Sequence, residues 1–415
     1  MNRKKFINTC GAAAALTALS PVISFSRSPF DLPEETKNSF LNRIQPITSE
    51  ERLQRMKHAQ SLMQENNIDA LFLEGGTSLN YFTGVDWWRS ERLFAMILPL
   101  KGEPYFIAPE FEASRAREQT GNAQLLTWKE NENPYEVIRQ LLDRNNLLNA
   151  TMSVEESTRY FVVANLQKQI PSLELQNATV ITAGCRSLKT AHEVELMQIA
   201  NDITAEVFQS SVKQLKTGMT EKEFGKIISG QFSALGFQGG ALVLFGEASA
   251  HPHGLVKENR LKENDIVLMD GGCSVEGYES DITRTTVFGK PTEKMNTVWS
   301  IVSQAQNEAL KFAKPGVDAE LVDEAARKVI TDKGYGPGYK YFTHRLGHGI
   351  GMDGHEWYYL VGGNKRLLQT GNMFSNEPGI YIPGEFGIRL EDEMLITEKG
   401  ARLLLPQAQS LEKMF

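Results

Sequence analysis

The chain has 415 residues, of which 41% are hydrophobic and 23% are charged. These proportions are typical of a globular protein that is too long for a single core, so we expect two domains. The 51 acidic residues outnumber the 44 basic ones and give a net charge of -7. The sequence has no basic run that could follow a phosphate backbone, which argues against nucleic acid as a partner.

The first residues have the features of an export signal. Basic residues at positions 3–5 precede a small-residue apolar run over residues 11–25, and Ser26 suits a cleavage site. We therefore interpret residues 1–26 as a cleaved signal peptide, which predicts an exported, periplasmic protein. The basic start also resembles a twin-arginine signal with one arginine replaced by lysine, so that route and the general secretory route are both open. An uncleaved anchor is disfavoured because Pro21 interrupts the run, which falls short of the ~20 residues that a span needs; we expect no stable membrane span.

Residues 45–183 alternate between helical and strand patterns. Residues 50–66 place apolar side chains at helical spacing, and residues 68–73 then have the pattern of a buried strand. The same alternation continues along the segment and predicts a smaller α/β domain on the N-terminal side. The further strand patterns cover residues 94–98, 105–108 and 125–128, and the further helical patterns cover residues 111–119 and 134–145.

A second domain is expected over residues 190–405. Residues 184–191 are polar and irregular, and residues 192–215 have the pattern of a long amphipathic helix that opens the domain. From residue 240 onward, strand patterns and glycine-rich turns dominate, so we predict an α+β domain with a mainly antiparallel sheet. The strand patterns cover residues 266–269, 285–288, 373–375, 380–382 and 388–397, and a helical stretch at 293–313 interrupts them.

Two aspartates flank a predicted hairpin in this second domain. Asp270 ends one apolar strand run and Asp281 begins the next, with a glycine-containing connection between them. Antiparallel pairing around a turn at residues 275–277 puts both side chains on one face, directly or diagonally opposite. Carboxylates that lie so close together repel each other unless they share a proton or a cation. A pair of ordinary turn aspartates is the alternative, and the hairpin alone does not decide between them.

The histidines are clustered rather than scattered. Of the seven in the chain, His344, His348 and His355 lie within one glycine-rich segment, and His251 and His253 form a second small group. Glycines around the first group leave the backbone bare, which permits the close approach of a substrate or an ion. A single histidine is more often structural, so the argument depends on the clustering.

Two glutamates complete the set of candidate residues. Glu377 directly precedes a Pro-Gly pair that ends a strand run, and residues 389–393 alternate so that Arg389, Glu391 and Glu393 share one face. An inward glutamate needs a positive partner, although a solvated edge strand is the alternative. Together the carboxylates and one imidazole predict a hard, oxygen-rich site suited to Mn²⁺, Co²⁺ or Zn²⁺ rather than a sulfur site.

The order of these residues resembles a known metal site. In residues 250–397, five of the candidate residues follow one another in the order of the ligand set of the pita-bread metallopeptidases. The resemblance is specifically to the proline peptidases (aminopeptidase P and Xaa-Pro dipeptidase). Upstream, SLNYFTGVDWWRSERLFAMILP followed by GEPYFIAP resembles the creatinase-type N-terminal domain that these enzymes carry. The resemblance implies a pita-bread catalytic domain with a curved, mainly antiparallel sheet behind a smaller α/β domain. The five residues are Asp270, Asp281, His348, Glu377 and Glu391.

The resemblance also implies a metal-dependent exopeptidase that hydrolyses the Xaa-Pro bond at the N-terminus of peptides or dipeptides. Asp281 and Glu391 would bridge two divalent ions per chain, with Mn²⁺ favoured and Co²⁺ or Zn²⁺ as alternatives. Asp270 would complete one coordination sphere, and His348 with Glu377 would complete the other. A water between the ions would be the nucleophile, and Glu377 would accept and pass on its proton.

Further roles follow from the same resemblance. His253 and His355 would hydrogen-bond the scissile amide, His344 would line the proline pocket, and Arg389 would orient the bridging carboxylates. The family tends to form homodimers in which one N-terminal domain closes the partner's site, so Asp86, Trp87 and Trp88 could contact substrate across that interface. Packing of the two indoles in a core is the alternative.

The residues leave the subclass open. Where eukaryotic-type dipeptidases carry an arginine for the free substrate carboxylate, this chain has Gly363, with Arg366 only nearby. A creatinase-like amidinohydrolase shares the fold without the metals, and a non-catalytic binding module on this fold would have lost ligand residues. The intact carboxylate set disfavours both, so we expect proline-containing peptides as substrates.

Overall fold

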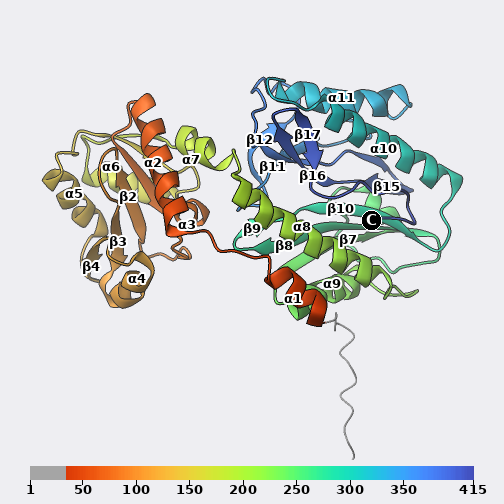
Figure 1. The fold of residues 1–415 in the computed structure, drawn as a ribbon, viewed down its shortest axis with the longest axis horizontal. Helices are drawn as coiled ribbons and strands as arrows, with labels where there is room; N and C mark the ends of the chain where they lie inside the picture. The colour runs from red at the N-terminus through yellow and green to blue at the C-terminus, as the bar shows by residue number, and fades with distance from the viewer. Residues whose placement is uncertain (1–33) are drawn as a thin grey trace, which may run out of the picture.

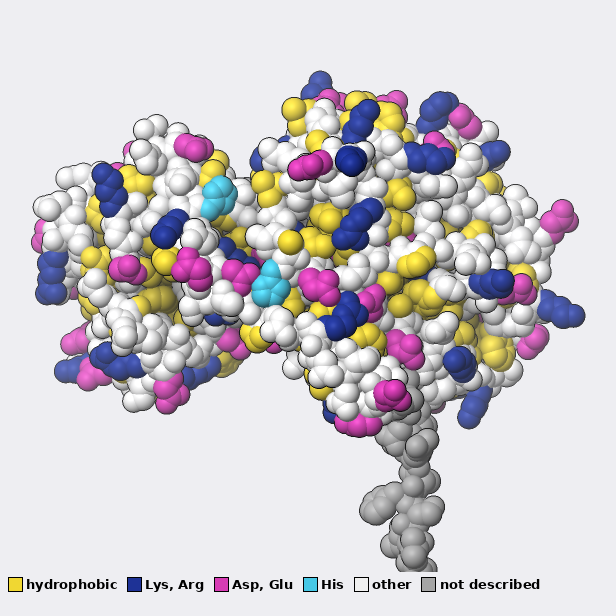
Figure 2. All heavy atoms as spheres, viewed as in Figure 1, with side chains coloured by type: hydrophobic (Ala, Val, Ile, Leu, Met, Phe, Trp, Pro, Cys, Tyr) yellow, Lys and Arg dark blue, Asp and Glu magenta, His cyan; other side chains and the backbone are white. Residues whose placement is uncertain are grey.

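The computed structural model describes residues 34–415, so the predicted signal peptide at residues 1–26 lies outside the described residues. The described chain forms two domains side by side, joined where α7 (Thr179–Arg186) leads into α8 (Ala191–Val212) (Figure 1). Acidic and basic side chains are interspersed over both domains on the face shown in Figure 2. Within residues 34–415, none of the helices combines the length and hydrophobicity of a membrane span.

The first domain is built on a six-stranded sheet in the order β4-β3-β2-β1-β5-β6. Its central strand, β1 (Ala70–Glu74), is buried on both faces, with Leu71 and Leu73 in one core and Ala70 and Phe72 in the other. This burial explains why the strand is a continuous apolar run rather than an alternating one. The other strands are β2 (Ala95–Pro99), β3 (Tyr105–Pro109), β4 (Gln124–Trp128), β5 (Thr151–Val154) and β6 (Glu174–Asn177).

Helices cover both faces of this sheet. The longest, α2 (Ser49–Glu65), begins at a capping box in which the Thr48 hydroxyl accepts the Glu51 N–H and the Glu51 carboxylate accepts the Thr48 N–H. The last, α7, includes residues 184–186, which the sequence predicted to be irregular. The others are α3 (Thr77–Thr83), α4 (Ala113–Thr120) after the short turn η1 (Glu110–Glu112), α5 (Pro134–Arg144) and α6 (Tyr160–Gln169).

Every strand pair in the second domain is antiparallel. One sheet has the order β10-β8-β7 with β9 beside β8, a second has the order β12-β11-β13-β16-β17, and β14 pairs with β15 alone. These pairings confirm the predicted α+β class with a mainly antiparallel sheet. The strands are β7 (Gln238–Phe245), β8 (Asp265–Val275), β9 (Tyr278–Glu279), β10 (Ile282–Phe288), β11 (Gly347–Gly349), β12 (Glu356–Leu360), β13 (Met373–Asn376), β14 (Gly379–Ile382), β15 (Phe386–Arg389), β16 (Asp392–Thr397) and β17 (Gly400–Leu403).

Two pairs of helices close the cores on the outer faces of these sheets. The helices α8 and α9 (Glu221–Leu235) pack with β7 and β8, and the short turn η2 (Gly246–Ala250) follows β7. The helices α10 (Glu293–Phe312) and α11 (Ala319–Asp332) pack on each other and share a second core with β13 to β16. The sheets between these layers carry the polar residues of the site described below.

The segment predicted as one strand over residues 388–397 is two strands. The strand β15 ends at Arg389 and pairs with β14, whereas β16 begins at Asp392 and pairs with β13. The chain therefore changes sheets at Leu390 and Glu391, and the Glu391 N–H donates to the Thr283 carbonyl of β10 instead of continuing the β14 ladder. The prediction of a single alternating strand was wrong because charged residues recur at every second position over residues 389–393, as in a continuous strand, and nothing in the sequence marks the crossing.

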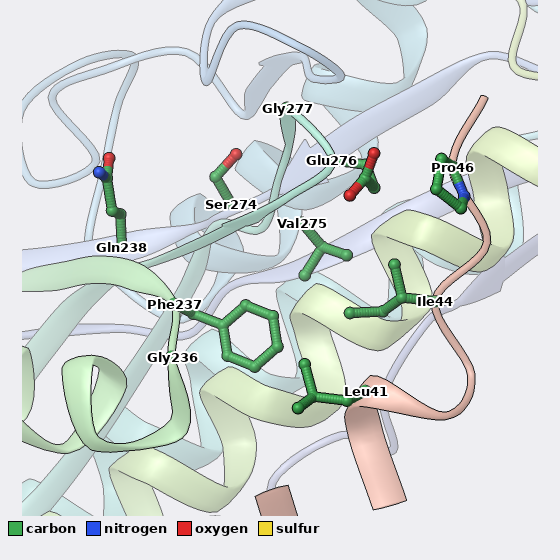
Figure 3. Close-up of a pocket in the computed structure, with 10 residues that line it drawn as sticks. All are labelled: Leu41, Ile44, Pro46, Gly236, Phe237, Gln238, Ser274, Val275, Glu276 and Gly277. Carbon is green, nitrogen blue, oxygen red and sulfur yellow. The ribbon is translucent and has the colours of Figure 1, made fainter. Parts of the chain in front are cut away.

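The N-terminal helix α1 (Glu34–Leu41) packs on the second domain rather than the first. Phe40 and Ile47 are buried in the same core as α8 and α9. A hollow of about 480 Å³ remains beside this segment, where Leu41 and Ile44 face Phe237 and the β8–β9 turn (Figure 3). Its lining contains one carboxylate, Glu276, and no histidine, so it is separate from the cluster described next.

Candidate metal centre and active site

The β8–β10 hairpin brings Asp270 and Asp281 to one face. Val275 pairs with Tyr278 across a two-residue turn, and both turn residues, Glu276 and Gly277, have positive φ, as tight hairpin turns require. Asp270 pairs with Thr283, so Asp281 stands two residues away along the opposing strand. Side chains in this diagonal relation share a face, which confirms the diagonal form of the prediction.

Three other segments deliver the remaining predicted ligands to the same place. His348 lies in β11, Glu377 directly follows β13, and Glu391 lies at the crossing between β15 and β16. The five residues line one cavity of about 660 Å³. Donor atoms lie within 4.8 Å of one another in three overlapping groups: Asp281, His348 and His355; His348, Glu377 and Glu391; and Asp270, Asp281 and Glu391.

The tautomer of His348 follows from its surroundings. Its Nδ1 lies 3.0 Å from the Gly349 carbonyl, which can only accept, so the proton is on Nδ1. Burial, with the charges of His355 and Arg345, lowers the pKa of His348 to about 4, and the ring is neutral at pH 7. The bare Nε2 then faces Glu377 Oε1 at 3.4 Å and Asp281 Oδ2 at 3.8 Å. Lone pairs that converge in this way repel unless a cation or a proton lies between them.

The carboxylates of the cluster also lack enough positive charge nearby to balance them. Burial, followed by repulsion from the neighbouring carboxylates, raises the pKa of Asp281 and Glu391 well above the usual range. Burial also raises the pKa of Glu377 to about 8, although Arg389 opposes this shift. Grouped carboxylates behave in this way when they lack a cation, and a divalent ion would return them to the ionised form.

Hydrogen bonds from residues behind the cluster hold its members in place. The Thr283 hydroxyl donates to Glu391 Oε2 at 2.6 Å, and the Ser375 hydroxyl donates to Glu377 Oε1 at 3.1 Å. Arg389 Nε donates to the Thr283 hydroxyl at 3.1 Å. These contacts leave the carboxylates little rotational freedom, which favours a preformed site.

The contacts of Arg389 differ in part from those that its predicted role requires. Its Nη2 forms an ion pair with Asp270, and its Nη1 donates to the Tyr381 hydroxyl at 2.8 Å. It reaches Glu391 only through Thr283, and within residues 34–415 it forms no ion pair with Asp281. The arginine therefore orients Asp270 directly rather than the two carboxylates that were predicted to bridge.

Three predicted histidines line the same cavity. The His355 ring stacks on the His348 ring at a centroid distance of 3.7 Å. His344 Nε2 lies 2.7 Å from the Tyr381 hydroxyl, and its Nδ1 lies 2.8 Å from the Arg345 carbonyl. Burial, with the charge of Arg389, lowers the pKa of His344 to about 3, so this ring is neutral at pH 7. His253 lines the cavity from the loop after η2.

Trp88 lies outside this cavity. Its side chain is 71% exposed and lines a neighbouring cleft of about 510 Å³ between the domains, which shares His355 with the main cavity. Of the two indoles, Trp87 alone packs in a core. Its ring stacks on the Phe94 ring at a centroid distance of 4.0 Å.

Four residues in or behind the site were not predicted: Thr283, Ser375, Tyr381 and Arg345. Strand alternation was the available signal for two of them. Thr283 follows Asp281 by two residues, and Tyr381 stands between Ile380 and Ile382 on the opposite face of β14. For the other two the signal was insufficient, because the sequence did not decide which face of β13 is inward at Ser375 and because Arg345 lies in a loop, where no period operates.

Both domains match known protein families. Residues 195–398 match the model of metallopeptidase family M24, and residues 55–188 match the creatinase/prolidase N-terminal domain. The chain belongs to metallopeptidase family M24. The carboxylates and His348 described above all lie in the part that matches this family. The chain is therefore a metallopeptidase with the pita-bread fold behind a creatinase-type domain, as predicted.

Individual M24 relatives match over most of their length. An uncharacterized peptidase of Schizosaccharomyces pombe is 37% identical over 86% of this chain and 82% of its own length. A Xaa-Pro dipeptidase of Lactobacillus delbrueckii subsp. lactis is 34% identical over 82% of this chain and 94% of its own. The crystal structure of a prolidase from Thermococcus sibiricus superposes with a TM-score of 0.78 at 30% identity and covers 85% of this chain and 96% of that one.

Proposed function

We propose that this M24 metallopeptidase is a dinuclear exopeptidase that hydrolyses the bond between an N-terminal residue and proline. One observation carries the metal part of the proposal. The unprotonated Nε2 of His348 and the oxygens of Glu377 and Asp281 converge at 3.4 and 3.8 Å, an arrangement that is repulsive unless a cation lies between them.

The donor set fits two hard divalent ions. Asp270, Asp281 and Glu391 offer one group of oxygens, and His348, Glu377 and Glu391 offer another, so Glu391 belongs to both. We propose Asp281 and Glu391 as bridging ligands and Mn²⁺ as the metal, with Co²⁺ or Zn²⁺ as alternatives, because the set contains four carboxylates and one imidazole and no sulfur. Bound metal would supply Lewis-acid chemistry and lower the pKa of the attacking water.

The protein's own groups would then move the proton and stabilise the developing charge. Glu377 would accept a proton from the attacking water at a carboxylate oxygen and return it to the leaving proline nitrogen. His355 and His253 are proposed to donate to the attacked carbonyl oxygen or the scissile amide. Arg389, through its ion pair with Asp270, keeps that carboxylate in position.

Preference for proline is supported by the names of two relatives, a Xaa-Pro dipeptidase and a prolidase. An Xaa-Pro bond is a tertiary amide without an N–H, so an enzyme for it must recognise the ring instead of that donor. We propose that His344 and the Tyr381 hydroxyl, 2.7 Å apart, form one wall of the ring pocket.

Assembly and location are proposed on separate grounds. The exposed Trp88 and the cleft beside it support a homodimer in which this indole contacts substrate or the partner subunit. The pattern of residues 1–26 supports export to the periplasm.

The test compares matched dipeptides. After incubation of the purified chain with Mn²⁺, release of alanine from Ala-Pro should exceed release from Ala-Ala by at least ~100-fold, the range reached when a site is built around one substrate group. Chelation should abolish both activities, and Asp281→Asn should reduce turnover to background. Equal rates on the two dipeptides would refute the proline preference, and full activity after chelation would refute the metal mechanism.

A further inference from the structure

Two arginines are among the described residues that line the carboxylate cavity, and they differ in their partners. Arg389 is nearly fully buried and engaged with Asp270. Arg345 is half-buried and forms no ion pair within residues 34–415. The nearby Arg327, by contrast, is paired with Asp323 at 2.8 Å. A permanent positive charge therefore lines the cavity without a carboxylate partner.

The Arg345 side chain is nevertheless held in place. Its guanidinium carbon lies 4.0 Å from the centroid of the Tyr359 ring, a cation–π contact. Tyr359 in β12 pairs with His348 in β11, so the arginine is braced against the residue directly across from a proposed metal ligand. Its backbone is fixed as well, since the Arg345 carbonyl bonds His344 Nδ1 and the next residue, Leu346, bonds β12 at 3.1 Å.

A guanidinium that is already oriented, charged and unpaired is suited to bind a carboxylate through two parallel hydrogen bonds. The remaining lining groups are poor candidates for that task. The carboxylates would repel an anion, and the Arg389 guanidinium is already engaged with Asp270. His344 is engaged with the Tyr381 hydroxyl, and His348 is engaged with the Gly349 carbonyl. The cavity therefore presents a cation to any anionic substrate group that enters it.

A dipeptide carries such a group close to the reacting bond. In Xaa-Pro the free carboxylate follows the scissile bond by one residue, roughly 3.5 Å of chain, so it must lie in the same cavity as the attacked carbonyl. A longer peptide has a neutral amide at that point and places its carboxylate farther away. The length of the substrate thus decides whether the charge of Arg345 is neutralised.

We propose that Arg345 binds the free carboxylate of the substrate and makes the enzyme a dipeptidase rather than an aminopeptidase of longer peptides. This inference rests on the proposed Xaa-Pro hydrolysis and adds the substrate class. It places the carboxylate-binding arginine in the loop before His348, away from the segment near Gly363 where eukaryotic-type dipeptidases carry theirs.

Arg366, the arginine nearest that segment, provides a matched control. Its guanidinium carbon lies 3.5 Å from the centroid of the Tyr358 ring, the neighbour of Tyr359 in β12. Successive strand residues point to opposite faces, so the two arginines stack on opposite sides of one strand. Arg345 lines the cavity and Arg366 does not.

The experiment measures KM and kcat for Ala-Pro and for its C-terminal amide, Ala-Pro-NH₂, with Mn²⁺-loaded wild type, Arg345→Ala, Arg345→Lys and Arg366→Ala. Wild type should prefer the free acid. Arg345→Ala should raise KM for Ala-Pro by roughly 10- to 100-fold, the effect of losing a hydrogen bond between charged groups, while the amide changes less than ~3-fold. Arg345→Lys should recover part of the loss, and Arg366→Ala should behave as wild type.

The outcomes separate this inference from the function on which it rests. If wild type cleaves neither substrate, the proposed function fails and the role of Arg345 fails with it. If wild type cleaves acid and amide equally well, or if Arg345→Ala slows both equally, Xaa-Pro hydrolysis stands and the carboxylate role of Arg345 is overturned. Circular dichroism and thermal unfolding of each variant establish that the effect does not come from misfolding.

Discussion

Replacing Glu356 with glutamine should weaken the junction between the domains. This carboxylate is 1% exposed and accepts from Arg186, the last residue of α7, at 2.5 Å and from Lys189, in the segment between α7 and α8, at 2.8 Å. The Met352 and Asp353 N–H groups also donate to it. Glutamine keeps the shape of the side chain but removes the charge, so two buried cations lose their fully buried partner.

The size of the expected loss in unfolding free energy follows from the pKa of the Glu356 carboxyl. Burial alone would raise it, but Lys189 and Arg186 lower the pKa of Glu356 from 4.5 to about 2. Each pKa unit corresponds to about 1.4 kcal/mol, so the charged form is favoured in the folded chain by roughly 3 kcal/mol. Removing one member of a buried ion pair has a similar cost, about 3–5 kcal/mol. We therefore expect Glu356→Gln to lower the free energy of unfolding by roughly 3 kcal/mol at pH 7.

The sign of the pH dependence is fixed by the direction of that shift. Because the folded-state pKa is depressed, the stabilisation is fully present above the unfolded value of 4.5 and is lost as pH falls toward about 2. Urea unfolding of wild type and Glu356→Gln should thus give curves that differ most at pH 5 to 7 and converge in acid. Glu385→Gln is the control, since Glu385 and its partner Lys294 are 44% and 48% exposed and its loss should leave the midpoint nearly unchanged. A Glu356→Gln midpoint equal to that of wild type at pH 7 would refute the reasoning.

Other expectations concern the site and the thiols. Because the pKa of Glu377 is about 8 in the metal-free protein, divalent ions must displace a proton at pH 7, so their affinity should rise between pH 6 and 8. Calorimetry in two buffers of different ionisation enthalpy would detect the released proton. A metal affinity that does not change with pH would contradict this expectation. Arg389→Ala should weaken metal binding by roughly 10- to 100-fold because Asp270 loses its orienting partner, and affinity equal to wild type would exclude that role. Cys185 and Cys273 are buried, which raises the pKa of each thiol to about 12. Neither thiol should therefore react with a thiol reagent before the protein unfolds, and rapid labelling of the native protein would contradict their burial.

The parts of the site that the sequence predicted are those where a local rule operates. Strand alternation on either side of a short turn placed Asp270 and Asp281 on one face, and the observed register agrees. Apolar periodicity found α2, α8 and α10 within a few residues of their ends. The order of His348, Glu377 and Glu391 carried a family resemblance that no periodicity would have supplied.

The parts that were missed depend on tertiary contacts. The strand β6 is polar because it is the sheet edge, and β11 has three residues, two of them glycines, so neither has a readable pattern. The crossing at Glu391 depends on a hydrogen bond to Thr283, more than 100 residues earlier in the chain. The partner of Arg389 could not be predicted for the same reason, since Asp270 becomes its neighbour only after β8 and β15 have packed.

Carboxylates and one imidazole from four distant segments are proposed to hold two cations. The most direct measurement is metal content per chain, determined by titrating metal-free protein with Mn²⁺ in a calorimeter and by elemental analysis after dialysis. We predict two ions per chain for the wild type and at most one retained by Asp281→Asn, because this carboxylate belongs to two of the three donor groups. Fewer than one ion bound by the wild type, or two ions bound equally well by Asp281→Asn, would contradict the account.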